Sequence, residues 1–186
     1  ESTGSSITEG IGTGRITKSW ELFYAQRSSE RKKSDPKPRA LAAFRVKDSK
    51  WDSETGDTRK LVMKLSKEAW ADFVDIGWAK GGSLYQNFFS QYQFILSPRG
   101  KGIDCFRTWQ ALHAGSIPIV ESSTIDSIYE DLPIVVLKSW KDLSVDILER
   151  HLRDFERNWN TMRWEKLTNR YWRRIMEKAV QNVKVS

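Results

Sequence analysis

The sequence of 186 residues holds a single cysteine, Cys105, and only two histidines, His113 and His151. One thiol cannot form an intrachain disulfide or supply a cysteine-rich zinc site, and two imidazoles are too few for a histidine-rich metal site. Long apolar runs are missing as well, since none approaches the ~20 residues that span a bilayer. These shortages exclude disulfide scaffolds, zinc modules and membrane-spanning helices.

Targeting and glycosylation signals are also missing from the sequence. The polar, glycine-dotted residues 1–14 carry no signal-peptide core, and no Asn-x-Ser/Thr acceptor site occurs. These absences favour a cytoplasmic location. A membrane-anchored, lumenal location is the expectation if an N-terminal portion has been removed.

The charge is basic overall but unevenly distributed. Of the net +7, residues 1–40 carry +3, residues 41–150 carry −1 and residues 151–186 carry +5. A nucleic-acid interface normally places a basic stripe on the folded domain itself, and here the middle of the chain is neutral. We therefore expect no nucleic-acid partner and read the basic ends as solvated segments.

With 39% hydrophobic and 30% charged residues, the composition is that of a globular protein. Short apolar runs alternate with helical patterns, which is typical of a parallel sheet covered on both faces. The predicted strands are 41–46, 73–76, 92–96, 117–120 and 134–137, and the predicted helices are 15–27, 58–67, 84–90, 104–114, 125–129 and most of 145–180. The fold class is α/β, a Rossmann-like parallel sheet flanked by helices.

Three regions follow from this pattern. Residues 1–39 form a polar lead-in with a possible helix and a linker, and residues 40–150 form the Rossmann-like domain. Residues 151–186 form a C-terminal helical segment packed on that domain, with an apolar stripe that we interpret as core packing.

Residues 97–120 (SPRGKGIDCFRTWQALHAGSIPIV) carry the most chemical information. They run from a strand end through a glycine-containing loop into a helix, where α/β proteins bind phosphates. Gly100 and Gly102 let the backbone approach a ligand, and Asp104 is a suitable N-cap for the helix. Arg99 and Arg107 suit phosphate because a guanidinium grips two oxygens at once.

The next strand end adds Ser122 and Ser123, whose hydroxyls and amides suit the same anion, although a simple helix cap is the commoner role for such serines. The glycine spacing matches neither the dinucleotide fingerprint nor a P-loop. The residues alone therefore indicate a phosphate-ligand site without deciding its occupant.

The same segment resembles the donor-binding motif of exostosin-like glycosyltransferases, which runs roughly S-P-R-G-x-G-x-D-x-x-R-x-W-E-A-L-x-x-G-x-I-P-I-V. Further similarity occurs in residues 41–44, 58–59, 129–133 and 138–140, so the resemblance covers about residues 40–150. It implies the C-terminal, nucleotide-sugar-binding domain of a GT-B enzyme. The expected reaction is inverting, metal-independent transfer of a sugar from a nucleotide diphosphate donor, favoured to be a UDP-sugar, to a hydroxyl of a glycan or other acceptor.

The resemblance also assigns roles to individual residues. Arg99 and Arg107 would stabilise the leaving diphosphate, with Gly100, Gly102, Asp104, Ser122 and Ser123 around it. No metal site and no further cofactor are implied, which agrees with the absence of an Asp-x-Asp triplet.

Two departures keep an alternative open. Gln110 stands where the family has a ribose-binding Glu, and a glutamine lacks the charge of that acceptor. The GT-B N-terminal domain, which carries the acceptor site and base, has no counterpart here, so we expect a missing domain or a partner chain. The alternative is a non-catalytic nucleotide-binding or interaction module.

Overall fold

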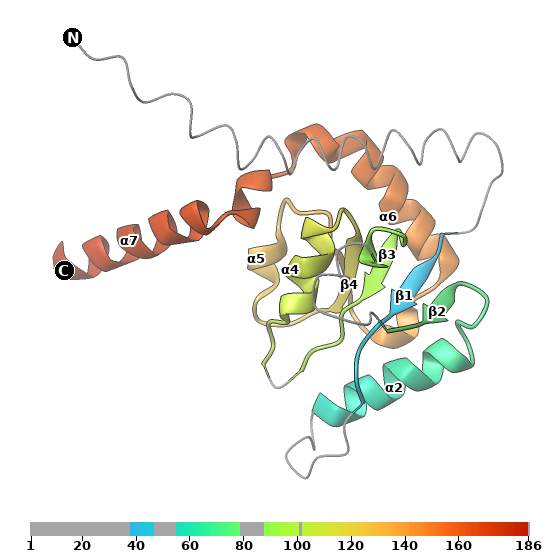
Figure 1. Cartoon of the computed structure of the whole chain (residues 1–186). Helices are drawn as coiled ribbons and strands as arrows, with labels where there is room; N and C mark the ends of the chain where they lie inside the picture. The colour runs from blue at the N-terminus through green and yellow to red at the C-terminus, as the bar shows by residue number, and fades with distance from the viewer. Residues whose placement is uncertain (1–37, 47–54, 79–87, 101, 186) are drawn as a thin grey trace.

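A computed structural model of the chain describes residues 38–46, 55–78, 88–100 and 102–185 (Figure 1). In chain order the elements are β1 (Ala40–Ala42), α2 (Thr55–Lys67), β2 (Val74–Ile76), β3 (Phe94–Leu96), α4 (Phe106–His113), β4 (Ile117–Glu121), α5 (Asp126–Tyr129), β5 (Val135–Leu137), α6 (Val145–Asn158) and α7 (Asn169–Val185). Short 3-10 turns η1 (Trp140–Asp142), η2 (Trp159–Thr161) and η3 (Trp164–Leu167) connect the later elements. The predicted helix at 15–27 and most of the predicted helix at 84–90 lie outside the described residues.

The strands form one parallel sheet in the order β2-β1-β3-β4-β5, which confirms the predicted α/β class. Its strand order reverses between β1 and β3, and parallel sheets bind ligands beyond the carboxyl ends of strands near such a reversal. The fold therefore directs attention to the loops that follow β1, β3 and β4.

Pro118 lies inside a central strand, where a proline usually removes a ladder hydrogen bond. Ile117 and Ile119 bond to β3, through Ile117 N to Gln93 O at 2.8 Å and Ser97 N to Ile119 O at 2.9 Å. The missing donor of Pro118 thus faces the β5 side, where pairing begins one residue later, at Ile119 and Val135. The proline costs this sheet no backbone hydrogen bond.

Alternation along the strands divides the core between the two faces of the sheet. Ala40, Ala42, Phe94 and Leu96 belong to the large core, which includes buried residues of α2, α4 and α6. Leu41, Ala43 and Ile95 belong to a smaller core with Phe89 and Ala111. Continuous apolar strands result because both faces are covered.

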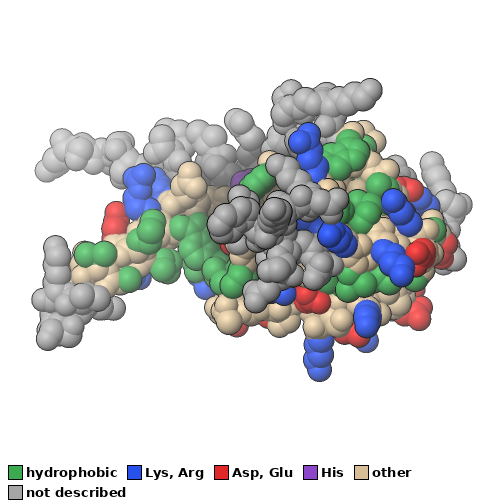
Figure 2. Space-filling model, turned by 90° about the horizontal axis from the view of Figure 1, so that it is seen from below, with side chains coloured by type: hydrophobic (Ala, Val, Ile, Leu, Met, Phe, Trp, Pro, Cys, Tyr) green, Lys and Arg blue, Asp and Glu red, His purple; other side chains and the backbone are tan. Residues whose placement is uncertain are grey.

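The C-terminal segment packs on the domain in its first part only. Leu148, Leu152 and Phe155 of α6 are buried, and α6 begins at Ser144, whose Oγ accepts a hydrogen bond from Ile147 N at 3.4 Å. In contrast α7 projects away from the sheet after its first turn, and hydrophobic side chains of its later turns are exposed on the surface (Figures 1 and 2). The apolar stripe predicted to pack in the core includes Ile175 and Met176, but these side chains are 44% and 62% exposed, so the prediction is wrong for this part of the stripe.

Candidate phosphate site at the ends of β3 and β4

The loop that joins β3 to α4 is held by an arginine from α2. Arg59 donates from Nε to Arg99 O at 3.1 Å and from Nη1 to Arg45 O at 3.3 Å. Its guanidinium lies against Gly100, where an added Cβ would come within 2.6 Å of Nη2. We predicted a glycine here so that the backbone could approach a ligand. The structure gives a different reason for Gly100: a larger side chain would collide with Arg59, which holds the loop.

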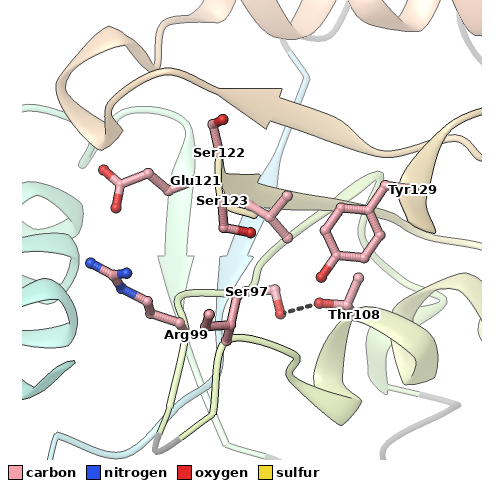
Figure 3. Close-up of a pocket in the computed structure, with 9 residues that line it drawn as sticks. Ser97, Arg99, Thr108, Glu121, Ser122, Ser123 and Tyr129 are labelled. Atoms are coloured by element: carbon pink, nitrogen blue, oxygen red, sulfur yellow. Dashed lines mark hydrogen bonds between the residues drawn. The ribbon is translucent and has the colours of Figure 1, made fainter. Parts of the chain in front are cut away.

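A small pocket opens beside this loop, between the ends of β3 and β4 (Figure 3). Its lining residues are Ser97, Arg99, Ile103, Thr108, Val120, Glu121, Ser122, Ser123 and Tyr129. The enclosed volume of about 20 Å³ is room for little more than one water molecule. A ligand of nucleotide size must therefore lie across the mouth of the pocket, where Arg99 is exposed.

The floor of the pocket is a hydroxyl cluster. Ser97 and Thr108 are 3% and 1% exposed, and their hydroxyl oxygens lie 2.9 Å apart, so either can donate to the other. The Tyr129 phenol points toward Thr108 from the opposite wall (Figure 3). Burial, followed by the nearby charges of Asp104 and other acidic groups, raises the pKa of Tyr129 to about 12. The phenol is therefore a neutral hydrogen-bonding group across the physiological range.

The predicted serines lie at the pocket but are already engaged. Ser122 Oγ donates to Asp126 Oδ2 at 2.6 Å, and Ser123 N donates to Asp126 Oδ1 at 2.9 Å. Glu121 beside them accepts a hydrogen bond from Trp140 N at 3.2 Å. Two carboxylates near the end of β4 lower its attraction for an anion, so the basic side of the site is the loop that carries Arg99.

Arg107 is turned away from this pocket. Its Nε donates to Ala43 O at 3.1 Å and its Nη1 to Cys105 Sγ at 3.4 Å, while the guanidinium carbon lies 5.7 Å from the ring centre of Phe44. The prediction that Arg99 and Arg107 converge on one anion therefore has no support in this geometry. Arg107 instead ties the start of α4 to the end of β1.

Asp104 does not cap α4, contrary to prediction. The helix begins at Phe106, its N-cap is Cys105, and no side chain caps it. The Asp104 carboxylate accepts hydrogen bonds from Trp109 Nε1, at 3.0 Å to Oδ1 and 3.3 Å to Oδ2. A later helix start places this carboxylate beside the indole, so Asp104 fixes a ring and leaves the first backbone amides of the helix without a side-chain cap.

The remaining predicted residues are scattered around the loop and helix. Gly102 is exposed and an added Cβ would meet Asp104 O at an ordinary 3.5 Å, so its role is not steric. Gln110 is half-buried on α4 and does not line the pocket. Cys105 is buried, and desolvation lowers the pKa of His113 at the end of α4.

Some contributors to this site were not predicted. Thr108, Glu121 and Tyr129 line the pocket, and Arg59 holds the loop. Thr108 and Glu121 each directly adjoin a predicted site residue, so a wider window around the motif would include them. Arg59 acts across 40 positions of sequence, and no local pattern signals that contact.

The described ranges offer neither a metal-binding cluster nor a membrane-spanning helix. They contain no group of three or more His, Cys, Asp or Glu side chains placed to hold a metal ion. Among the helices described, none has the length and apolar character to cross a bilayer.

Comparison with known protein families identifies a matching domain. The model of the RXYLT1 C-terminal domain matches residues 57–184, more than two thirds of the chain. The chain belongs to this family. The RXYLT1 C-terminal domain family is exostosin-like, which confirms the resemblance, and it makes the chain a glycosyltransferase-related domain. The match extends past residue 150 into α7, beyond the part that the motif alone indicated. A search of curated proteins finds no match.

Proposed function

We propose that this domain binds the donor of a glycosyltransferase and helps to transfer its sugar from a nucleotide diphosphate to an acceptor hydroxyl. The observation that carries the proposal is the position of Arg99. It stands exposed at the mouth of the pocket, on the loop between β3 and α4, at the carboxyl ends of parallel strands. Membership of the exostosin-like family supports a nucleotide sugar, with a UDP-sugar favoured, over other phosphate ligands.

The proposed transfer inverts the anomeric carbon and uses no metal. The acceptor oxygen forms a bond to that carbon as the bond to the β-phosphate oxygen breaks, and the electron pair leaves with the nucleotide diphosphate. Arg99 would stabilise the negative charge on the departing phosphate, because a fixed guanidinium needs no reorganisation during the step. The acceptor proton passes to a base outside this site, which we assign to a further GT-B domain or to a partner chain.

Arg107 has a different part in this proposal from the one its motif implies. With Nε on Ala43 O and Nη1 on Cys105 Sγ, it sets the position of α4 and so of the loop before it. We propose that it supports leaving-group stabilisation by positioning Arg99 and by its net charge near the strand ends. Gln110 would meet the donor ribose with an amide in place of a carboxylate.

Calorimetric titration with UDP and with GDP tests the donor site. Replacing Arg99 with Ala should weaken the binding of the preferred nucleotide by about 10- to 100-fold, the equivalent of a hydrogen bond to a charged group. Arg157→Ala is the matched control, because Arg157 is exposed on the last turn of α6, outside the pocket. Equal binding by wild type and Arg99→Ala would remove Arg99 from the site.

A non-catalytic nucleotide-binding module is the second candidate. Gln110 in the place of the ribose-binding acid favours it, and so does the engagement of Ser122 and Ser123 by Asp126. Single-turnover transfer from a radiolabelled UDP-sugar, with and without a companion GT-B domain, separates the two. Nucleotide binding without transfer in either case would favour the module.

A further inference from the structure

A second and larger hollow lies between α4 and the segment formed by η3 and α7. Its walls include Asp104, Trp109 and His113 on one side and Lys166, Asn169 and Trp172 on the other. It encloses about 360 Å³, which is within the size range of small-molecule sites. Of the residues that match the donor motif, only Asp104 and Trp109 line this hollow.

This hollow shares a wall with the phosphate pocket. At three places in the chain, one residue lines the first pocket and its immediate neighbour lines the hollow. The pocket residues are Ile103, Thr108 and Tyr129, and their neighbours in the hollow are Asp104, Trp109 and Ile128. The two spaces thus lie along the same three backbone segments, and Tyr129 from one lining packs against Trp109 from the other with ring centres 6.3 Å apart.

Two indole rings form a corner of the hollow. Trp109 and Trp172 meet edge to face, with ring centres 6.1 Å apart and planes at 81°. Both indole N–H groups already have partners inside the protein, Asp104 for Trp109 and Lys166 O for Trp172 at 2.7 Å. The rings are therefore fixed, and what remains for a ligand is their apolar carbon surface.

The polar groups of the hollow suit hydroxyls better than a net charge. Lys166 is 5% exposed and its ammonium donates to Ile128 O at 3.4 Å and Glu130 O at 2.5 Å, so its head is anchored to the α5–β5 loop. His113, with its lowered pKa, is neutral at pH 7 and offers one ring nitrogen as donor and one as acceptor. The Asp104 carboxylate adds acceptors and Asn169 adds an amide. Opposite charges on Asp104 and Lys166 leave the hollow without a strong preference for ions.

We propose that this hollow binds a neutral saccharide ring, next to the phosphates that the first pocket would hold. A pyranose presents a face of C–H groups and a rim of hydroxyls, which matches a corner of two indoles surrounded by mixed donors and acceptors. A flat nucleobase would stack on only one of two perpendicular rings. The adjacency to a donor site rests on the proposed function, whereas the saccharide chemistry of the hollow does not.

Indole NMR tests this proposal in the intact chain. With tryptophan labelled by ¹⁵N, the nine tryptophans give at most nine indole signals, and Trp109→Phe and Trp172→Phe assign the two that matter. Titration with methyl glycosides of xylose, glucose, galactose and N-acetylglucosamine should move both signals in a saturable way. The signals of Trp70 and Trp140, which are buried in the main core, should stay in place.

Variants and nucleotides complete the design. Trp172→Ala should weaken glycoside binding about tenfold or more. Asp104→Asn should have a similar effect, and it serves as the test if Trp172→Ala folds poorly. Trp78→Ala, which changes an exposed tryptophan outside the hollow, is the control and should have no effect. Response to a UDP-sugar but to neither UDP nor a glycoside identifies the ring as the donor's own sugar. Response to glycosides in the presence of saturating UDP identifies it as an acceptor saccharide.

Two outcomes would overturn the proposal. One is the absence of any shift of the Trp109 and Trp172 signals with every glycoside and UDP-sugar, and the other is a shift that Trp172→Ala and Asp104→Asn leave unchanged. Failure of the donor site is a separate result. In that case the wild-type chain would respond to glycosides but not to UDP or GDP. If the donor site is correct, only Arg99→Ala should show this pattern.

Discussion

The substitution Gly100→Ala should break the hydrogen bonds that connect α2 to the loop between β3 and α4. An alanine Cβ would lie 2.6 Å from Arg59 Nη2 and 3.5 Å from Arg59 Cζ, and these are the atoms it would meet among the described residues beyond its two chain neighbours. Since the obstacle is the end of a flexible side chain, we expect Arg59 to move and the loop to keep its path. The cost is then the two hydrogen bonds that Arg59 donates to Arg99 O and Arg45 O.

The magnitude follows from those bonds. Both are solvent-exposed, so together they should contribute about 1–2 kcal/mol, at the low end for a charged donor. Against this, Gly→Ala gains about 0.4–1 kcal/mol by restricting the unfolded chain, because Gly100 has no positive φ. Gly100→Ala should therefore destabilise the protein by about 1 kcal/mol, or about 2–4 °C in Tm for a chain of this size.

A double-mutant cycle gives the decisive reading. In the Arg59→Ala background the atoms that the methyl would meet are gone, so Gly100→Ala should become neutral or stabilising, with a coupling of about 1–2 kcal/mol in urea unfolding. Gly102→Ala is the matched control and should be tolerated in both backgrounds, since its Cβ would make only a 3.5 Å contact with Asp104 O. Equal destabilisation by Gly100→Ala with and without Arg59 would refute the reasoning.

Three further predictions concern the same region. Thr108→Val should cost about 1–3 kcal/mol in urea unfolding because it strands the buried Ser97 hydroxyl, and adding Ser97→Ala should recover part of the loss; no recovery would mean that the 2.9 Å pair is not the cause. Gly115→Ala should destabilise by about 1–2 kcal/mol because φ is 79° at the end of α4, and a thermal melt unchanged from wild type would contradict this. The pKa of Tyr129 is raised to about 12 in the folded chain, against about 10 in the unfolded chain. Between these values the unfolded state binds fewer protons than the folded state, so the free energy of unfolding should fall by about 2 kcal/mol as pH rises from 10 to 12. Urea unfolding compared with Tyr129→Phe checks it, since the variant should lack this part of the alkaline loss.

The strands were predictable because burial leaves a direct trace in composition. Each of the five predicted strands overlaps a strand of the sheet, although β1 is Ala40–Ala42 where 41–46 was predicted and β4 runs one residue further, to Glu121. The helix predicted at 58–67 is α2 with three more residues at its start. Strand order was not predictable, since nothing local in β1 distinguishes pairing with β2 alone from pairing with both β2 and β3. The outward path of α7 was missed for a related reason. Its apolar stripe has the period of a packed helix, but periodicity does not say what the stripe packs against.

At the site, the loop and Arg99 were predictable from the motif, whereas the direction of each side chain was not. Arg107 lies on the expected helix, but it reaches Ala43 O across 64 positions of sequence, a contact that depends on strand order. Asp104 was assigned a cap because acids favour helix starts. The carboxylate instead accepts a hydrogen bond from the Trp109 indole, because the helix starts at Phe106, two residues later than predicted.

The three arginines near the sheet's reversal point therefore have unequal roles. Arg59 donates to the backbone carbonyls of Arg99 and Arg45, and Arg107 donates to Ala43 O and Cys105 Sγ. These two arginines fix the loop after β3 and the start of α4, whereas Arg99 is exposed at the pocket. Asp126 and Glu121 supply opposing charge at the end of β4, within the same small region. Among the residues that the structure describes, a diphosphate bound here would be held chiefly by the exposed Arg99 guanidinium, and such attraction is strongly screened by salt. Binding of the nucleotide by this domain alone should then be weak at physiological ionic strength. Tight binding would require groups from a further GT-B domain or from the hollow between α4 and the η3–α7 segment.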